Sequence, residues 1–276
     1  MPHSNAARHA VSGGGHDQPG EVLRASWSAG RATLGAWIVT ADSFAVEVLC
    51  RLGFDWIGID MQHGLISPER LPDLLRAAAV TGTPALVRVA WNDPASILPA
   101  LDTGAGGVIV PMVSSADDAR RAVAACRYPP EGERSFGPSR AALGDPAYSA
   151  ERANRSVLCF PMIETRQGAE DLAAILATPG IDGVFVGPSD LALSYGSEVA
   201  PSSPPPEHRE RIEQIGSRCA DAGLVPGIYC GGAAAAGGWT RAGFRLLALD
   251  SNTALLGHAA QDALGRARRT ISAPGD

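Results

Sequence analysis

Lysine is missing from this chain, since all 23 of its basic residues are arginine. An enzyme that forms a Schiff base with a ketone needs a lysine amine, and so does one that anchors pyridoxal phosphate. The composition therefore excludes both kinds of covalent amine catalysis.

Cysteine, basic clusters and long apolar runs are also scarce. The five cysteines form no C-x-x-C pair and their number is odd, which favours reduced structural thiols and a cytoplasmic location. The formal net charge of -6 and the lack of a basic run argue against nucleic acid as a partner. No stretch approaches the roughly 18 uninterrupted apolar residues of a membrane span, so we expect no membrane partner.

The length of 276 residues suits one large domain. A barrel of eight strand–helix units takes roughly 250 residues. Residues 1–24 contain no apolar segment of the kind found in signal peptides. We therefore predict a flexible, disordered N-terminal tail over residues 1–24 and a single barrel domain over residues 25–271.

Eight short, continuously apolar runs recur along the chain, as expected of strands that are buried on both faces. They occupy residues 34–39, 55–60, 85–89, 107–112, 157–164, 183–188, 224–230 and 245–250. Helical patterns lie between them, over residues 43–53, 67–80 and 115–128. Repeated strand–helix alternation indicates a parallel sheet, and eight units in this length predict an α/β fold, a closed (β/α)8 TIM barrel.

Two segments interrupt this alternation. Residues 128–156 are too long for a plain connector, and long loops in compact domains tend to be functional. We expect this segment to overhang the mouth of the barrel after the fourth strand. Residues 197–212 are rich in proline and are predicted to be solvated.

Ionisable side chains gather at the ends of strands two, three, five and six, where barrels of this kind hold their active sites. The second strand ends with Asp60 and is followed by His63, and the third carries Arg88 near its end. The fifth strand ends in Glu164, and Asp190 follows the sixth in VGPSDL. Each residue alone has a structural explanation, such as a helix cap, an ion pair or an ordinary surface histidine. Their joint placement at one face favours a functional site.

This set of residues suits enolate chemistry on a 2-oxo acid. Glu164 and Asp190 form a hard oxygen site, which suits Mg²⁺ or Mn²⁺ better than zinc. The first turn after GPSD offers backbone N–H groups to an anion. Arg88 provides a planar positive fork for a developing oxyanion, and His63 is a base near neutral pH.

Six stretches identify a family: GFDWIGIDMQHG, VRVAWNDP, LDTGAGGVIVPMV, RYPPEGERSFG, PMIETRQG and GIDGVFVGPSDL. On these stretches the chain resembles the HpcH/HpaI aldolases, the metal-dependent class II pyruvate aldolases of the 4-hydroxy-2-oxoheptanedioate and 2-keto-3-deoxy-glucarate aldolase type. The resemblance implies a carbon–carbon lyase that joins a pyruvate enolate to an aldehyde or reverses that reaction. It also implies a divalent metal cofactor (Mg²⁺, Mn²⁺ or Co²⁺) and a homo-oligomer, which is a hexamer in the family.

The resemblance assigns roles to individual residues. Glu164 and Asp190 would bind the metal, and backbone groups at Ser189 and Asp190 would hold the carboxylate of pyruvate. Arg88 would stabilise the enolate, and His63 would be the base.

Three further positions follow from the resemblance. Asp102, in ALDTGAGG, matches a family carboxylate that raises the basicity of the histidine. Because Asp102 lies just before the fourth strand, we expect it at the amino end of its own barrel and in the active site of a neighbouring subunit. Met162 stands where a substrate-contacting Gln is common, and Gln62 stands where Glu often precedes the histidine, so the aldehyde partner stays open.

Three rival interpretations stay open. A citryl- or malyl-CoA lyase would use similar metal carboxylates, although no basic patch suits a CoA tail. A non-catalytic barrel could serve as a binding module, against which stands the complete set of site residues. An enzyme acting on phosphosugars would need a glycine-rich phosphate loop late in the barrel, and residues 230–238, CGGAAAAGG, offer glycines there.

Overall fold

The computed structural model describes residues 18–272, and in them eight parallel strands close into a barrel. The strands are β1 (Thr33–Ile38), β2 (Trp56–Asp60), β3 (Ala85–Arg88), β4 (Gly107–Val110), β5 (Leu158–Ile163), β6 (Gly183–Val186), β7 (Val225–Tyr229) and β8 (Leu246–Ser251). Each strand pairs with the next along the chain, and β8 pairs with β1. The predicted (β/α)8 barrel is confirmed, and all eight strands fall on the apolar runs of the sequence.

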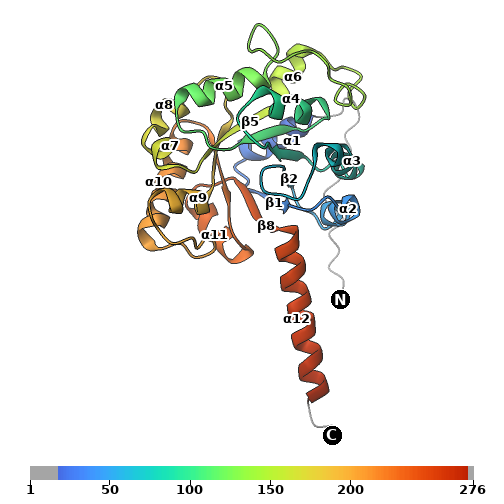
Figure 1. Cartoon of the computed structure of the whole chain (residues 1–276), viewed down its shortest axis with the longest axis vertical. Helices are drawn as coiled ribbons and strands as arrows, with labels where there is room; N and C mark the ends of the chain where they lie inside the picture. Colours follow the sequence, from blue (N-terminus) through green and yellow to red (C-terminus); the bar gives the residue numbers. More distant parts are fainter. Residues whose placement is uncertain (1–17, 273–276) are drawn as a thin grey trace.

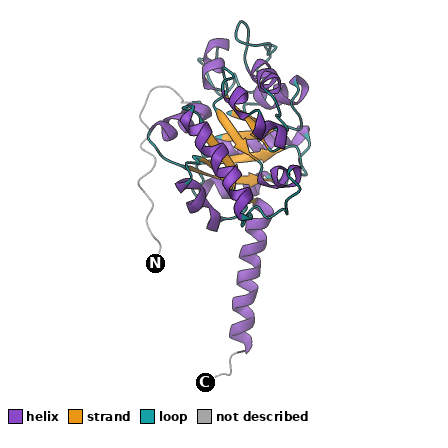
Figure 2. Cartoon of the chain, turned by 90° about the vertical axis from the view of Figure 1, so that its left-hand side faces the viewer, coloured by secondary structure: helices purple, strands orange, loops and turns teal. Residues whose placement is uncertain are grey.

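Helices surround the strands, as Figure 2 shows in purple around orange. They are α1 (Pro19–Ser28), α2 (Ser43–Arg51), α3 (Leu71–Val80), α4 (Pro94–Asp102), α5 (Ala116–Cys126), α6 (Ala150–Ser156), α7 (Arg166–Glu170), α8 (Leu172–Leu176), α9 (Pro188–Ser194), α10 (Pro206–Asp221), α11 (Ala233–Arg241) and α12 (Asn252–Ser272). A 3-10 turn, Pro68–Arg70, precedes α3. The three predicted helical segments therefore form α2, α3 and α5.

The core has two layers, because each strand sends alternate side chains to opposite faces. The outer layer lies between strands and helices and is mainly aliphatic. The inner layer fills the barrel and contains the large rings of Trp37, Trp56, Phe160 and Phe185. Trp37 and Phe185 stack with ring centroids 5.7 Å apart, so aromatic packing forms the floor below the carboxyl ends of the strands.

Helix α1 closes the amino end of the barrel and corrects the predicted tail. Leu23 and Trp27 of this helix pack into the inner layer, and the ring of Trp27 meets Phe160 edge-on at 5.8 Å. Arg24 binds Asp182 through two hydrogen bonds of 2.9 and 2.6 Å. The predicted disorder up to residue 24 is therefore wrong for the residues from Pro19 onward, because burial of these apolar side chains fixes the helix, while residues 1–17 lie outside the described part.

The long segment 128–156 lies at the amino end of the barrel, not over its mouth. It follows α5, and a connection that comes after a helix returns to the amino ends of the strands. The amides of Arg140 and Ala141 donate to the carbonyl of Asp102 at 3.0 and 3.1 Å. The predicted overhang at the mouth is therefore wrong.

Helix α12 extends away from the barrel beside β8, in red in Figure 1. None of its residues is buried, and Leu256, Leu264 and Ile271 are exposed. It is the longest helix between residues 18 and 272, yet neither it nor any other helix in that range is long and apolar enough to cross a membrane.

Candidate active site

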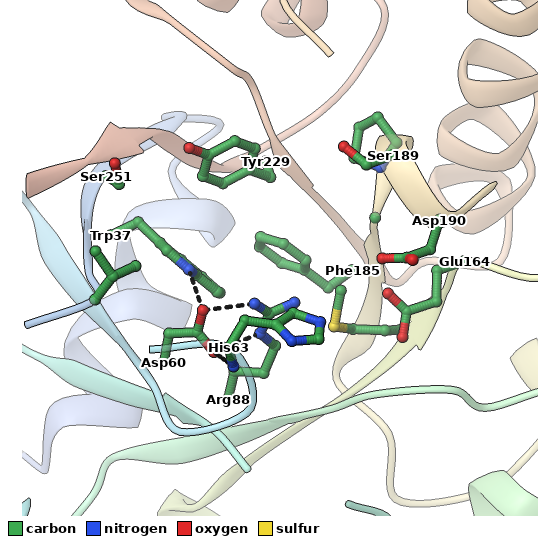
Figure 3. A pocket seen from close by; sticks show the side chains of 14 residues that line it. Trp37, Asp60, His63, Arg88, Glu164, Phe185, Ser189, Asp190, Tyr229 and Ser251 are labelled. Carbon is green, nitrogen blue, oxygen red and sulfur yellow. Dashed lines mark hydrogen bonds and ion pairs between the residues drawn. The ribbon is translucent and has the colours of Figure 1, made fainter. Parts of the chain in front are cut away.

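A cavity of about 230 Å³ opens at the carboxyl ends of the strands, and Figure 3 shows its lining. Its walls come from Trp37, Val39, Asp60, His63, Arg88, Met162, Glu164, Phe185, Gly187, Pro188, Ser189, Asp190, Tyr229 and Ser251. Seven residues predicted from the sequence are among them: Asp60, His63, Arg88, Met162, Glu164, Ser189 and Asp190. Asp102, the eighth, does not line the cavity.

Asp60 organises the turn that carries His63. Its carboxylate accepts two hydrogen bonds from Arg88, from Nε at 2.9 Å and from Nη2 at 2.6 Å. The backbone amides of Gln62 and His63 donate to the same carboxylate at 3.0 and 3.2 Å, and Trp37 Nε1 donates at 3.2 Å. One buried carboxylate therefore fixes both the guanidinium and the turn, as the dashed lines of Figure 3 show.

Arg88 keeps part of its guanidinium for a ligand. Burial alone would raise the pKa of Asp60, but the hydrogen bonds and charge of Arg88, together with the hydrogen bonds from His63 and Trp37, lower this pKa below its ordinary value. Asp60 is thus ionised at neutral pH and engages Nε and Nη2 of Arg88, whose Cζ lies 5.3 Å from the ring centre of Trp37. The remaining donors of this planar fork can bind an oxyanion in the cavity.

Glu164 is a buried carboxyl beside a second carboxyl. It is 1% exposed, and its Oε1 accepts from the backbone amide of Met112 at 2.6 Å. The pKa of Glu164 is raised to about 7, mainly by burial and with a smaller contribution from the charge of Asp190, against the Met112 hydrogen bond and the charge of Arg88, which lower it. In Figure 3 the carboxyl groups of Glu164 and Asp190 lie beside each other.

Helix α9 presents its first turn to the cavity. Ser189 and Asp190 occupy this turn, where the backbone N–H groups have no acceptor inside the helix. The carbonyl of Pro188 is held by the ring of His208, whose Nε2 lies 2.8 Å away. His208 belongs to the proline-rich segment that was predicted to be solvated, but it is buried in α10, so that prediction is wrong for this part of the segment.

These residues fit a hard divalent cation. Within residues 18–272 no group of three or more His, Cys, Asp or Glu side chains is placed to hold a metal ion. Glu164 and Asp190 would be the protein ligands, leaving the other positions to water and substrate oxygens, as Mg²⁺ commonly requires. A buried carboxylate beside a second one is unfavourable without a cation, so the donor set matches this kind of ion.

Asp102 ends helix α4 at the opposite end of the barrel. Its Oδ1 accepts from Arg134 Nη2 at 2.8 Å, and the guanidinium of Arg134 lies over the ring of Tyr128 at 4.4 Å. Within one chain Asp102 therefore lies apart from the cavity, as the sequence led us to expect. Its role in a neighbouring site stays a prediction.

Sequence reasoning missed the remaining wall of the cavity. Trp37 belongs to β1 and Val39 follows it, Phe185 belongs to β6, and Tyr229 and Ser251 end β7 and β8. The sequence places Trp37, Tyr229 and Ser251 at or near the carboxyl ends of predicted strands. A search of strand ends for aromatic and hydroxyl side chains, as well as ionisable ones, would have found these three.

Comparison with known proteins places this geometry in a family. The sequence profile of the HpcH/HpaI aldolase/citrate lyase family matches residues 33–259. The chain is 36% identical over 250 residues to a hydroxypyruvate/pyruvate aldolase of Rhizorhabdus wittichii, which covers 89% of this chain and 98% of the relative. It is 38% identical over 237 residues to a 4-hydroxy-2-oxo-heptane-1,7-dioate aldolase of Salmonella paratyphi B, which covers 84% and 89%.

A solved structure agrees with these relatives. A HpcH/HpaI aldolase/citrate lyase family protein from Burkholderia cenocepacia superimposes with a TM-score of 0.83 at 30% identity, covering 90% of this chain and 99% of that one. The range matched by the family profile, residues 33–259, contains all eight strands of the barrel. The chain thus belongs to the HpcH/HpaI aldolase/citrate lyase family, and the enzyme class expected from its sequence, a carbon–carbon lyase, is confirmed.

Proposed function

We propose that this protein is a divalent-metal-dependent pyruvate aldolase that cleaves 4-hydroxy-2-oxo acids or forms them from pyruvate and an aldehyde. The observation that carries this proposal is the buried Glu164 beside Asp190, in the same cavity as Arg88 and His63. The names of the two aldolase relatives support it.

Each residue has a task in the cleavage direction. The first-turn N–H groups at Ser189 and Asp190 bind the carboxylate of the 2-oxo acid. His63 takes the proton of the 4-hydroxyl group, the bond between C3 and C4 breaks, and its electrons pass into the enolate of pyruvate. Arg88 donates N–H groups to the enolate oxygen. A divalent ion held by Glu164 and Asp190 would act as a Lewis acid for the 2-oxo group.

The cavity argues against the CoA-lyase alternative. Its volume of about 230 Å³ is small, and Arg88 and His63 are the only cationic or imidazole side chains among its lining residues. A CoA thioester would need room for its long tail and cations for its phosphates. A small 2-oxo acid with an aldehyde fits the cavity better.

The assembly and location of the protein are parts of the same proposal. We expect a homo-oligomer, hexameric as in the family, in which Asp102 enters a neighbour's site. The five cysteines are all free and buried in the described structure, which supports a reducing compartment such as the cytoplasm.

Exchange of the pyruvate methyl protons for deuterium tests the core chemistry without knowledge of the aldehyde. With Mg²⁺ or Mn²⁺, NMR should show exchange catalysed by the enzyme, and a chelator should abolish it. Borohydride with pyruvate should leave the protein mass unchanged, since the chain contains no lysine. Exchange that survives exhaustive chelation would contradict the metal-dependent mechanism.

A further inference from the structure

One wall of the cavity contributes no group that would bind the metal, the carboxylate of pyruvate or the enolate oxygen. It is formed by Trp37, Val39, Tyr229 and Ser251. We call it the acceptor wall, because the aldehyde that accepts the enolate would face it. In Figure 3 Tyr229 and Ser251 lie across the cavity from Asp60 and Arg88, and away from Glu164. An aldehyde that reacts with an enolate held by Glu164, Asp190 and Arg88 would extend toward this wall.

A buried carboxylate stands behind the acceptor wall and fixes its polar groups. Tyr229 donates its hydroxyl proton to Asp250 Oδ1 at 3.0 Å, and Asp250 is 7% exposed. The backbone amide of Ser251 donates to the same oxygen at 2.8 Å. The phenol proton therefore points away from the cavity, and the phenol oxygen is left to act as an acceptor.

Ser251 supplies the matching donor. Its side chain lies on the same side of the cavity as Tyr229 (Figure 3), and its hydroxyl is 3.1 Å from Thr253 Oγ1 in the first turn of α12. It also accepts from the amide of Ala254 at 3.1 Å, which leaves its own proton free to rotate between several acceptors. Side by side, the acceptor wall thus presents one oxygen that accepts and one hydroxyl that can donate.

We infer that the acceptor wall recognises a hydroxyl group on the aldehyde, so that this enzyme favours hydroxylated aldehydes over plain aliphatic ones. The inference rests on the proposed aldolase function. An alcohol hydroxyl both donates and accepts one hydrogen bond, which matches the pair formed by Tyr229 and Ser251. A plain aldehyde offers no hydrogen bond to this pair, which keeps only its bonds to Asp250, Thr253 and Ala254, so it binds less tightly than a hydroxylated one.

The charge of the wall points the same way. Neither arginine nor histidine is among the four residues of the acceptor wall, and the carboxylate of Asp250 lies directly behind it. Arg88 lies against Trp37, but at the end of the wall formed by Tyr229 and Ser251 a carboxylate on the aldehyde would meet the like charge of Asp250, whereas a neutral hydroxyl would not. The wall therefore fits a neutral, hydroxylated acceptor.

The reaction that the wall would serve is an aldol addition. The methyl-derived carbon of the pyruvate enolate forms a bond to the carbonyl carbon of the aldehyde. The former carbonyl oxygen takes up a proton and becomes the 4-hydroxyl group, and no oxidant or reductant is needed. The recognised hydroxyl sits on the next carbon and keeps its proton throughout.

Glycolaldehyde and acetaldehyde test this inference, because they differ by one hydroxyl group. The quantity measured is the ratio of kcat/KM for glycolaldehyde to kcat/KM for acetaldehyde in addition to pyruvate. Tyr229→Phe removes the phenol oxygen and should lower this ratio about tenfold, the effect of one hydrogen bond. Tyr195→Phe, a tyrosine outside the cavity, is the matched control and should leave the ratio as in the wild type.

A second variant and a second measurement separate the possible failures. Ser251→Ala removes the donor of the pair and should also lower the ratio, even if Tyr229→Phe fails to fold. A ratio that stays at the wild-type value in every folded variant would overturn the inference. Pyruvate methyl exchange in the same samples tests the proposed function alone, and its absence in the wild-type protein would overturn that function and the inference that rests on it.

Discussion

Two aspartate–arginine pairs lie at opposite ends of this barrel, and each is stacked on an aromatic ring. Asp60 and Arg88 lie at the carboxyl end beside Trp37, while Asp102 and Arg134 lie at the amino end beside Tyr128. In both pairs the arginine side chain is buried, with 11% exposed for Arg88 and 1% for Arg134.

The two aspartates differ in their exposure and in the number of hydrogen bonds that they accept within their own chain. Asp60 is 2% exposed at its side chain and accepts from a bidentate guanidinium, an indole and two turn amides. Asp102 is 17% exposed at its side chain and accepts from Arg134 through Oδ1. The hydrogen-bond positions of the Asp60 carboxylate are taken up within its own site, whereas the partly exposed Asp102 carboxylate can still contact a neighbouring subunit.

Mixing two inactive variants would test this comparison most strongly. His63→Ala removes the base and should lower turnover by about 10²–10⁴, while pyruvate and metal still bind. Asp102→Asn should also be poorly active. Refolded together in a closed oligomer, the two should regain activity in about a quarter of the sites, because half the sites carry His63 and half of those face an intact Asp102.

The assay reports kcat on the mixture, and native mass spectrometry confirms that mixed oligomers form. His63→Ala mixed with wild type at the same ratio is the control for dilution. Mixed oligomers without any gain over the separate variants would place Asp102 outside the active site.

Replacing each arginine by lysine compares the two pairs directly. Arg88→Lys should lower turnover by about 10²–10³, because a lysine ammonium group cannot bind both carboxylate oxygens of Asp60 and also bind an oxyanion. Arg134→Lys is the matched change at the other end and should have a smaller effect on turnover. Steady-state kinetics measures both, with circular dichroism to confirm folding, and equal losses would show that the two pairs do not differ in role.

The raised pKa of Glu164 predicts how metal affinity depends on pH. Because burial raises this pKa to about 7, the carboxyl is mostly protonated below pH 7 and must lose its proton to bind a cation. Affinity for Mn²⁺ should therefore fall about tenfold per pH unit below 7 and level off above it. Calorimetric titration between pH 5.5 and 8 measures this, and Glu164→Gln should bind weakly with no such slope.

His208 provides the smallest effect, because it touches the site only through Pro188. Burial lowers the pKa of His208, so the folded protein favours the neutral ring, while the unfolded chain gains a proton near pH 6.5. The stability that the protein has with a neutral, buried His208 is therefore present above pH 6.5 and is lost as the pH falls below it. His208→Gln should lose less unfolding free energy than the wild type between pH 7 and 5, with a KM for pyruvate raised only a few-fold.

Chemical denaturation at several pH values measures the stability of His208→Gln. A variant with the same acid sensitivity as the wild type would show that His208 does not contribute to it.

The sequence predicted the barrel and most of the site for one physical reason. Strands buried on both faces are continuously apolar, so their ends are visible in the sequence, and the ends carry Asp60, Arg88 and Glu164. The strand order of a barrel then brings these residues to one face. The predicted positions of His63 and Asp190 follow from the same reasoning, since each comes shortly after a strand.

The wrong predictions concern features that depend on three-dimensional packing rather than on the local sequence. Leu23 and Trp27 belong to the inner layer, which the local pattern of an opening segment does not reveal. The end of the barrel at which residues 128–156 lie depends on the helix that precedes them. Tyr229 and Ser251 were missed because neither is charged at neutral pH, although their positions at strand ends were predicted.

The absence of a side chain at Gly187 leaves room for the carboxyl group of Glu164. Its backbone angles, φ -98° and ψ 92°, suit any ordinary residue, so the fold itself does not require glycine there. A methyl group at this position would lie 2.6 Å from Glu164 Oε2 and 3.0 Å from the side chain of Met162. Over evolutionary time, selection on this codon would act through Glu164 and Met162, the two buried side chains that alanine would displace. A gene copy that lost the activity would be free to accept alanine here once a smaller residue replaced Glu164.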